Sequence, residues 1–456
     1  MSDMAQNKMG VKPMLPLVLG MSLPAMFSML IQALYNIVDS IFVSNYNEDA
    51  FTAVSLAMPL QMIAISFAVG TAVGVNSLIA RRLGAKNFAE ADSAAVTGLF
   101  LALINWLVFI VVGLTASGAF IGLFTDDPVV LEYGRQYLTI VLCVSFGMML
   151  SVMGEKILQA TGNMIIPMLT QSLGAVINII FDPLLIFGVG FFPELGIMGA
   201  AVATVFGQIC SMTFILIILF VKKHAVKIRL KGFRPKRQVI KNIYAVGFPA
   251  IIMQSIGSVM VSGINAIISL TAASRAVADA FIRSFGAYFK LQSFIFMPVF
   301  GLNQGVMPII GYNYGARNKK RLYSALRIGI IIAIIIMSLG TLLFQLAPGW
   351  LLSFFNADEL MLQVGEPSFR IISLSFLLAA LGIMFSALFQ AVGKGMYSMI
   401  MSVCRQLVVL LPVAYLLAQN DLMTMWYAFP IAEFVCLGIG LAFFFRLRSK
   451  QLNNLE

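Results

Sequence analysis

The sequence predicts an all-α membrane protein with twelve transmembrane helices, arranged as two parallel six-helix repeats with a central cleft. Three observations support this fold class: the composition, the number of long apolar stretches and an internal repeat. Of the 456 residues, 60% are hydrophobic and only 11% are charged, and the mean hydropathy is +0.95. These values lie far outside the range of soluble globular proteins.

Twelve apolar stretches are each long enough to cross a hydrocarbon core of about 30 Å. They run over Met14–Val43, Phe51–Ala80, Ser93–Phe124, Tyr137–Ala160, Ile165–Phe187, Gly196–Val221, Ile240–Leu270, Tyr288–Tyr312, Leu326–Leu346, Ile371–Ala391, Met396–Ala418 and Met425–Phe445. The first is too long for the apolar region of a signal peptide, and no small-residue cleavage site follows it. We therefore expect it to be part of the mature protein.

The net charge of +11 is distributed unevenly along the chain. Most of the 30 Lys and Arg residues lie in alternate loops and in the two tails, whereas the opposite loops are mainly acidic. This asymmetry predicts a multi-pass protein of the cell membrane with both termini in the cytoplasm. The basic loop from Lys222 to Lys241 lacks a pattern of interleaved aromatic residues, so we interpret it as a lipid-facing topology signal and exclude nucleic-acid binding.

The second half of the chain repeats the first at an offset of 231 residues. The offset pairs Gly84-Ala85-Lys86-Asn87 with Gly315-Ala316-Arg317-Asn318, and Gln159-Ala160 with Gln390-Ala391. Near the start the register slips, because Pro24 pairs best with Pro249, which implies a longer first loop in the second half. With six spans each, both copies must enter the membrane from the same side. We predict an N-terminal lobe at residues 1–232, a cytoplasmic linker at residues 233–239 and a C-terminal lobe at residues 240–456.

Four acids lie within the predicted spans: Asp39, Glu155, Asp182 and Glu433. A carboxylate in the middle of a bilayer costs roughly 2.5 to 3.5 kcal/mol on insertion scales, so each is a candidate functional residue. Three of the four belong to the first lobe, which predicts that the two lobes have different roles.

The fifth span contains the sequence V-I-N-I-I-F-D-P, with Asn178 and Asp182 four residues apart. On a helix these two side chains share one face. Pro183 cannot donate to the carbonyl of Ile179 and disfavours helical geometry at Asp182. We therefore expect broken backbone, with an unpaired carbonyl oxygen, beside the acid.

The first span carries a polar stripe at helical spacing, formed by Gln32, Tyr35, Asn36 and Asp39. Its expected partner is the face of Asn178 and Asp182, because two neighbouring buried carboxyl groups can share a proton and release it near neutral pH. The alternative is that these groups only join helices through hydrogen bonds.

The other two acids leave two interpretations open. Glu155 is either part of the cation-coupling site or a structural group near a cytoplasmic helix end, beside Lys156. Glu433 is either functional or simply paired with Arg405.

Two further features bear on the mechanism. Pro24 should kink the first span, either as a static packing kink or as a moving hinge. Some of the 28 methionines suit an adaptable substrate surface, although most are expected to fill core or face lipid. We assign to the substrate cavity Gln32, Asn36, Met62, Met253 and Gln254.

Cysteine and histidine are too few and too scattered for a metal or catalytic centre. The four cysteines lie apart within apolar spans, and the only histidine, His224, lies in the basic loop. We expect no enzyme activity, no cofactor and no dedicated metal centre. Gly393-Lys394 does not form a phosphate-binding loop, because Gly395 stands where Ser or Thr is required, so an ATP-driven pump is not predicted.

These features together resemble the multidrug and toxic compound extrusion (MATE) family, specifically its bacterial proton-coupled multidrug efflux members. The likeness covers essentially all twelve spans. Its most specific piece is F-M-P-V-F-G-L-N-Q-G-V-M-P-I-I-G-Y-N-Y-G-A-R-N, from Phe296 to Asn318, and a weaker counterpart is G-V-N-S-L-I-A-R-R-L-G-A-K-N, from Gly74 to Asn87.

The resemblance implies a secondary antiporter that exports amphipathic, often cationic drugs or toxic compounds by alternating access. It implies that Asp39, Tyr35, Asn178 and Asp182 couple transport to a proton, with sodium at Asp39, Asn178 and Asp182 as the alternative. It also implies bending of the first span at Pro24. Sodium-coupled members carry acids in spans seven and ten, which this chain lacks, so a sodium site in the second lobe is not expected.

The expected partners are small-molecule drugs or organic cations and the lipid bilayer, and we expect the chain to act as a monomer. The alternative function is a lipid or lipid-linked-sugar flippase of the same wider superfamily. A flippase requires a basic cavity for a phosphate headgroup, for which Arg283 and Lys290 are the only candidates identified.

Overall fold

The computed structural model describes residues 7–355 and 357–455. Within the first long helix, the side chains of Asn36, Ser40 and Ser44 lie outside the described residues, so the predicted role of Asn36 in a substrate cavity has no structural counterpart here. In the described part of the chain all regular structure is helical, with no strand.

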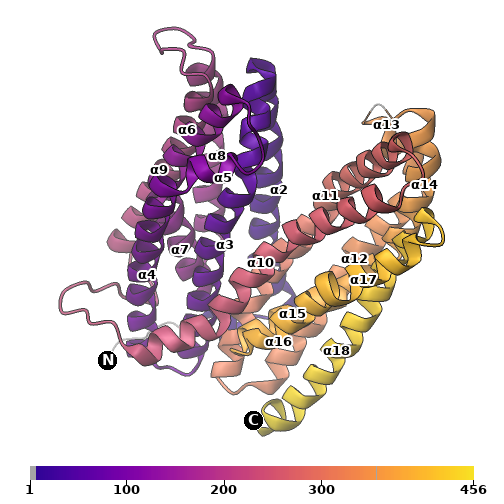
Figure 1. Ribbon diagram of the computed structural model, residues 1–456. Helices are drawn as coiled ribbons and strands as arrows, with labels where there is room; N and C mark the ends of the chain where they lie inside the picture. Colours follow the sequence, from indigo (N-terminus) through magenta and orange to yellow (C-terminus); the bar gives the residue numbers. More distant parts are fainter. Residues whose placement is uncertain (1–6, 356, 456) are drawn as a thin grey trace. The chain divides into compact units, whose positions relative to one another are not determined.

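The helices follow the order of the predicted spans (Figure 1). In the first half they are α1 Lys8–Val11, α2 Met14–Tyr46, α3 Glu48–Gly84, α4 Phe88–Thr115, α5 Ser117–Ile121, α6 Pro128–Cys143, α7 Phe146–Ala160, α8 Ile165–Ile186 and α9 Ile197–Val221. In the second half they are α10 Arg237–Thr271, α11 Arg275–Gly315, α12 Lys319–Leu346, α13 Pro348–Ser353, α14 Glu359–Ser373, α15 Phe376–Ala391, α16 Gly395–Val403, the π-helix η1 Cys404–Val409, α17 Leu410–Ala418, the 3₁₀-helix η2 Leu422–Tyr427, α18 Ala428–Lys450 and the 3₁₀-helix η3 Leu452–Asn454.

The number of spans agrees with the prediction. Ten helical segments of the described chain are each long and apolar enough to cross a membrane, and two bent helix pairs bring the total to twelve. The bent pairs are α6 with α7, at 45°, and α14 with α15, at 46°. Three helix starts differ clearly from the prediction: α11 begins at Arg275 rather than Tyr288, α14 at Glu359 rather than Ile371, and α6 at Pro128 rather than Tyr137. The largest difference is at α11. Ser274 caps this end by accepting a hydrogen bond from the N–H of Val277, and the added turns carry charged residues that suit an aqueous surface.

The chain divides into two compact units that exchange parts of two helices. Unit 1 comprises residues 1–8 and 27–251, and unit 2 comprises residues 9–26 and 252–456. The first half of α2 therefore packs within unit 2, and the first half of α10 packs within unit 1. The units thus differ from the contiguous lobes expected from the sequence, and α10 already begins inside the expected linker, at Arg237.

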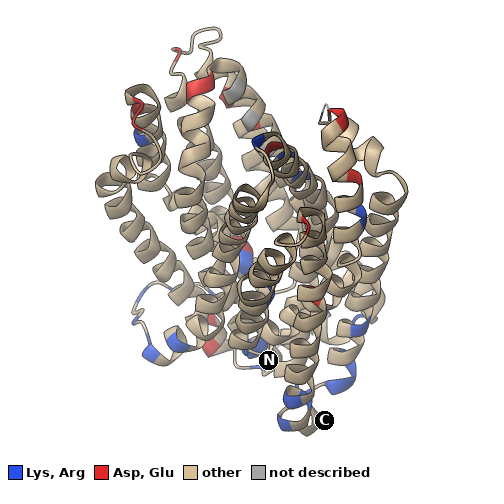
Figure 2. Cartoon of the chain, turned by 45° about the vertical axis from the view of Figure 1, so that its right-hand side comes forward, with Lys and Arg blue, Asp and Glu red and all other residues tan. Residues whose placement is uncertain are grey.

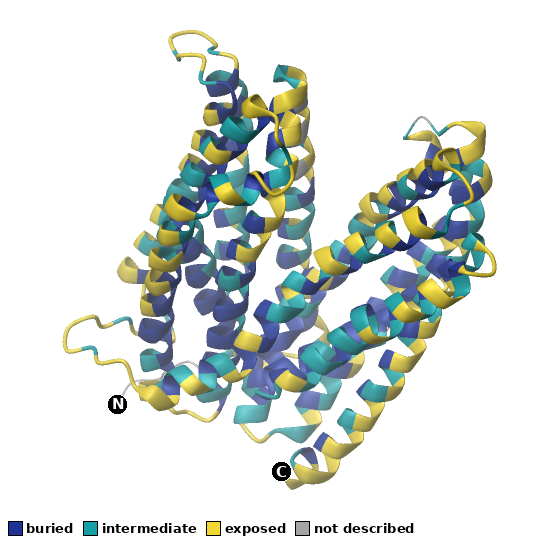
Figure 3. Ribbon diagram, viewed as in Figure 1, coloured by how far each residue is buried: buried dark blue, intermediate teal, exposed yellow. Residues whose placement is uncertain are grey.

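The internal repeat is visible in matching local geometry. Lys86 and Arg317, which are 231 positions apart, are the two described non-glycine residues with positive φ, each at 58°. The next residues, Asn87 and Asn318, cap α4 and α12 by accepting hydrogen bonds from the backbone. Of the ten unbroken spans, α3 in unit 1 and α11 in unit 2 are the most buried (Figure 3). In an apolar stretch of 18 residues, 67% of α3 and 56% of α11 is buried.

The exchanged half-helices pack against equivalent glycines. A Cβ atom added to Gly70 of α3 would lie 2.6 Å from the backbone nitrogen of Ile251, and one added to Gly301 of α11 would lie 2.6 Å from that of Met26. Gly70 and Gly301 are 231 positions apart, and Met26 and Ile251 share the slipped offset of Pro24 and Pro249. Each exchanged half-helix therefore makes the same contact in the unit that contains it. The slip itself reflects the longer first connection expected in the second half, because residues 272–274 separate α10 from α11, whereas Asn47 alone separates α2 from α3.

Charge is segregated along the helix axes. Within each unit, Lys and Arg gather at the helix ends nearest to that unit's chain terminus, and Asp and Glu lie mainly at the opposite ends (Figure 2). This distribution is typical of a polytopic membrane protein, in which basic residues mark one side.

Candidate functional site

The candidate site is centred on Asn178 and Asp182 of α8, whose side chains are 2% and 0% exposed. Nδ2 of Asn178 donates a hydrogen bond of 3.2 Å to Oδ1 of Asp182, as expected for side chains four residues apart on one helical face. The expectation of broken backbone at Asp182 is wrong, since α8 continues through Pro183 to Ile186. A proline removes a single donor from a helix, and the turns on either side hold the remaining ladder in place.

The second half of α2 brings Asp39 and Tyr35 to the same place. The carboxyl groups of Asp39 and Asp182 lie within hydrogen-bonding reach of each other. The Tyr35 hydroxyl lies within reach of Thr204 on α9 and close to both carboxyl groups. Because α2 from Phe27 onward belongs to unit 1, all these groups lie in one compact unit.

Three members of this site were not predicted from the sequence. Thr204 Oγ1 accepts a hydrogen bond of 3.3 Å from Nδ2 of Asn178. Tyr137 of α6, which is 4% exposed, lies close to both carboxyl groups and within hydrogen-bonding reach of Gln61 on α3. A polar side chain inside an apolar span was the available signal for each, but that signal does not indicate which neighbouring helix the side chain faces.

The arrangement leaves oxygen acceptors unused. Oδ2 of Asp182 and Oδ1 of Asn178 are buried, and no N–H or hydroxyl group of the described residues donates a hydrogen bond to either. Two adjacent carboxyl groups in a buried site carry a large electrostatic cost if both are ionised, and a proton or another small cation removes that cost. The site therefore has the chemistry of a cation acceptor.

Glu155 lies in the same unit but not beside the acid pair. It is 3% exposed on α7, and its Oε2 accepts a hydrogen bond of 2.9 Å from Gln171 of α8. Lys156 turns to another neighbour, donating to Oε1 of Gln159 at 2.9 Å. Gln171 precedes Asp182 by eleven residues, or roughly 16 Å along the helix axis.

Glu433 of α18 belongs to unit 2 and is paired there. Its Oε1 accepts a hydrogen bond of 3.1 Å from Nη1 of Arg405, which lies in the π-helix η1. Of the two interpretations left open by the sequence, this contact favours the ion pair.

The remaining predicted residues are placed as follows. Pro24 lies within α2, two residues before the boundary between the units, and α2 continues helically through it. Gln32 and Met62 belong to unit 1, and Met253 and Gln254 belong to unit 2. Met62 is 38% exposed, Gln254 is exposed, and Gln32 and Met253 are half-buried.

Metal ligands do not gather elsewhere in the described chain. It contains no cluster of three or more His, Cys, Asp or Glu side chains that could hold a metal ion. The acid pair, with its two carboxyl groups and neighbouring amide and hydroxyl oxygens, is where a small cation would fit.

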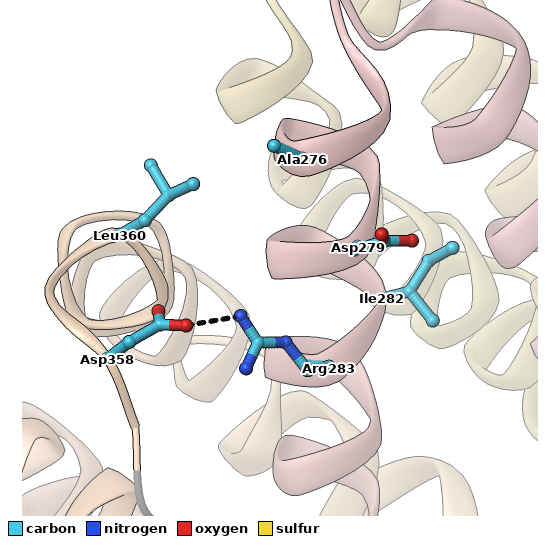
Figure 4. A pocket seen from close by; sticks show the side chains of 6 residues that line it. All are labelled: Ala276, Asp279, Ile282, Arg283, Asp358 and Leu360. Carbon is cyan, nitrogen blue, oxygen red and sulfur yellow. Dashed lines mark hydrogen bonds and ion pairs between the residues drawn. The ribbon is translucent and has the colours of Figure 1, made fainter.

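A separate hollow of about 550 Å³ lies on unit 2 (Figure 4). It is lined by Ala276, Asp279, Ile282, Arg283, Asp358 and Leu360. Nη2 of Arg283 and Oδ2 of Asp358 are 2.6 Å apart across it, so its only lining cation is already paired.

Up to twelve membrane spans with a buried acid pair among them define a polytopic membrane transporter rather than an enzyme. The MatE family model matches residues 24–184 and 242–416, so the chain belongs to the MatE family, as its sequence motifs indicate.

Individual relatives agree with this assignment. The chain is 26% identical over 432 residues to the multidrug export protein MepA of Staphylococcus haemolyticus (strain JCSC1435), covering 94% of this chain and 93% of the relative. A solved structure described as the outward-facing conformation of a multidrug resistance MATE family transporter of the MOP superfamily superposes with a TM-score of 0.91. It is 27% identical and covers 99% of this chain and 100% of the other.

A second structure of equal similarity comes from Pyrococcus furiosus Vc1 (DSM3638), with a TM-score of 0.91, 28% identity and full coverage of both chains. It is described as a MOP superfamily transporter in which the reverse polarity of the binding pocket suggests a different function. The fold is thus common to transporters with different pockets, and the function of this chain must be argued from its own residues.

Proposed function

We propose that this protein is a secondary antiporter that exports amphipathic, often cationic compounds in exchange for protons. The observation that carries the proposal is the pair formed by half-buried Asp39 and buried Asp182, with Asn178 donating one hydrogen bond to Asp182 and another to Thr204. Relatives of this chain are multidrug export proteins, which supports the substrate class.

Coupling follows from the charge of the acid pair. When a proton binds, it neutralises one carboxyl group and removes the repulsion between Asp39 and Asp182. The deprotonated pair instead needs a positive charge or water nearby, so the two states favour different packing of α2 against α8. A charge crossing the membrane gains about 2.3 kcal/mol per 100 mV, which is enough to drive export against a gradient.

The proposal includes the setting of the protein. We place it as a monomer in the cell membrane, with both termini in the cytoplasm, because the basic helix ends lie nearest to the chain termini. Pro24 is proposed as the hinge of α2. The substrate would contact Gln32, Asn36, Met62, Met253 and Gln254, and Glu155 is proposed to serve the coupling ion rather than the substrate.

The test uses purified protein in liposomes and the fluorescent cation ethidium. Ethidium transport is measured under an imposed pH gradient and, separately, under an imposed sodium gradient, for the wild type, Asp39→Asn and Asp182→Asn. We expect the pH gradient to drive transport by the wild type and both substitutions to lower it by roughly tenfold or more. Wild-type rates in both variants would overturn the coupling role, and transport driven only by sodium would identify sodium as the coupling ion.

The flippase alternative has little support in the described residues. Arg283 is paired with Asp358, and Nζ of Lys290 lies 6.0 Å from the ring centre of Phe355. Neither residue forms a buried basic pocket for a phosphate headgroup.

A further inference from the structure

We propose that a polar seam between α7, α8 and α9 carries the coupling cation from the Asp39–Asp182 pair to Glu155, near the helix ends that bear the basic residues. The polar seam is defined by Asp182, Asn178, Thr204, Gln208, Gln171 and Glu155. The inference rests on the proposed function and adds a route by which the ion leaves the site.

The first support is the alignment of polar groups on α8. At 100° per residue, Gln171, Asn178 and Asp182 fall within about 40° of one another around the helix. Between Gln171 and Asn178 this face carries only Gly174 and Ala175. No large apolar side chain of α8 therefore separates the polar groups.

The second support comes from α9, which packs along α8. Thr204 bonds to Asn178 at one level, and Ser211 donates a hydrogen bond of 3.0 Å to the carbonyl of Thr170 at a lower level. Gln208 lies between them in the chain, four residues after Thr204, and so reaches the level of Gly174 and Ala175. Its backbone lies against Gly147 of α7, while Gly207 and Ser211 of α9 face Gly174, so Gln208 adds an amide to the seam on the side of α7.

The third support is that the buried atoms of the seam that lack a hydrogen-bond partner are all oxygen acceptors. Four buried side-chain oxygens in the seam lack a hydrogen-bond partner among the described residues: Oδ2 of Asp182, Oδ1 of Asn178, Oε1 of Gln208 and Oε1 of Gln171. A buried unpaired acceptor costs free energy. Four acceptors in sequence favour a positively charged species, such as a hydrated proton or a small cation, over an anion.

Glu155 forms the far end of the seam. Oε2 accepts the hydrogen bond from Gln171, and Oε1 lies 3.5 Å from Oγ of Ser151. Glu155 is five residues before the end of α7 at Ala160, close to Lys156, whose ammonium group is held by Gln159. A carboxyl group in this position can receive a cation from the seam and pass it on toward the basic side.

The unit 2 equivalents of the seam positions are apolar or small. At the repeat offset, Asn178 corresponds to Val409, Asp182 to Val413 and Glu155 to Ser386. The seam is therefore a property of unit 1 alone, which agrees with a single ion route.

The test separates passage of the ion from its binding. The seam variants are Ala175→Leu, which places a large apolar side chain between Asn178 and Gln171, and Gln208→Met, which removes the amide at nearly the same volume. The matched control is Val176→Leu, on the adjacent residue of α8 that is 52% exposed. Ethidium binding and the accompanying proton release are measured in detergent with a pH indicator, and pH-driven ethidium transport is measured in liposomes.

We expect both seam variants to bind ethidium and release protons within about twofold of the wild type, while their transport rates fall by roughly tenfold or more. The control should transport at the wild-type rate. Binding in detergent also shows that a variant is folded, and Gln208→Met alone decides if Ala175→Leu does not fold. Wild-type transport in the folded seam variants overturns the seam while leaving the proposed function intact. A wild-type protein that neither a pH nor a sodium gradient drives overturns both.

Discussion

Asn178 donates two hydrogen bonds from a single amide nitrogen, one of 3.2 Å to Asp182 on its own helix and one of 3.3 Å to Thr204 on α9. The carboxyl group that faces Asp39 is thus held by a residue that also joins two helices. Packing of α8 against α9 and the position of the acid are therefore not independent. A change in either should alter transport.

Replacing Thr204 by Val tests this connection. Val keeps the shape of Thr but removes the hydroxyl group, so Asn178 and Tyr35 each lose a partner. A hydrogen bond contributes about 1 kcal/mol net, and we expect pH-driven ethidium transport to fall about fivefold. Thr204→Ser is the control and should retain most activity. Wild-type transport in Thr204→Val, with loss in Thr204→Ser, would show that the methyl group and not the hydroxyl matters at this position.

The ion pair between Arg405 and Glu433 gives a prediction about the stability of the protein rather than about transport. Their side chains are 25% and 12% exposed and 3.1 Å apart, so Arg405→Met leaves a mostly buried carboxylate without its partner. Breaking a buried pair costs about 3 to 5 kcal/mol, whereas replacing both members with apolar residues is often neutral. We expect the melting temperature in detergent to fall clearly in Arg405→Met and to recover in Arg405→Met/Glu433→Leu. A double variant as unstable as the single one would contradict this account.

Much of the fold could be predicted because the signals are local. A hydrocarbon core requires long apolar runs, and the helical period alone brings Asn178 and Asp182 to one face. The pairing of Lys86 with Arg317 followed from matching motifs, and the structure gives both residues the same backbone conformation. The acid pair could be anticipated because a carboxyl group in a span must find a polar partner.

The remaining features depend on which helices touch. Thr204 and Tyr137 are single polar residues in apolar or amphipathic helices, and their sequence context is compatible with facing lipid, core or site. The slip between the two repeat offsets indicates only the longer first connection in the second half. No sequence signal indicates the exchange of half-helices. Pro183 was expected to break α8, but neighbouring turns keep the helix intact.

Asp358 provides a prediction of pH dependence outside the membrane spans. The hydrogen bond from Arg283, together with that from the N–H of Met361, lowers the pKa of Asp358 below its ordinary value. A lowered folded-state pKa stabilises the protein above the unfolded pKa of about 3.9, and this contribution is lost as the pH falls through the folded value.

We therefore expect Asp358→Asn, which can still cap α14, to lower the melting temperature slightly at pH 7. The difference from wild type should shrink below about pH 4. The effect should be small because both partners are about half exposed. In the background of Arg283→Gln the pH-dependent part should diminish, and an unchanged pH profile there would show that Arg283 is not its cause.

The glycine contacts allow the exchange of half-helices to be tested in both units with the same substitution. Gly70→Ala and Gly301→Ala each place a methyl group against the backbone of the exchanged half-helix, at Ile251 and Met26. Backbone cannot yield as a flexible side chain can, so we expect each variant to lose about 1 to 3 kcal/mol of stability. Gly286→Ala, on the same helix as Gly301, meets nothing within 4 Å and should gain about 0.5 to 1 kcal/mol from helix propensity. In detergent, the melting temperatures of Gly70→Ala and Gly301→Ala should therefore be lower than that of Gly286→Ala. If Gly70→Ala and Gly301→Ala melted at or above the temperature of Gly286→Ala, the close approach of each half-helix to its unit would not hold in the folded protein.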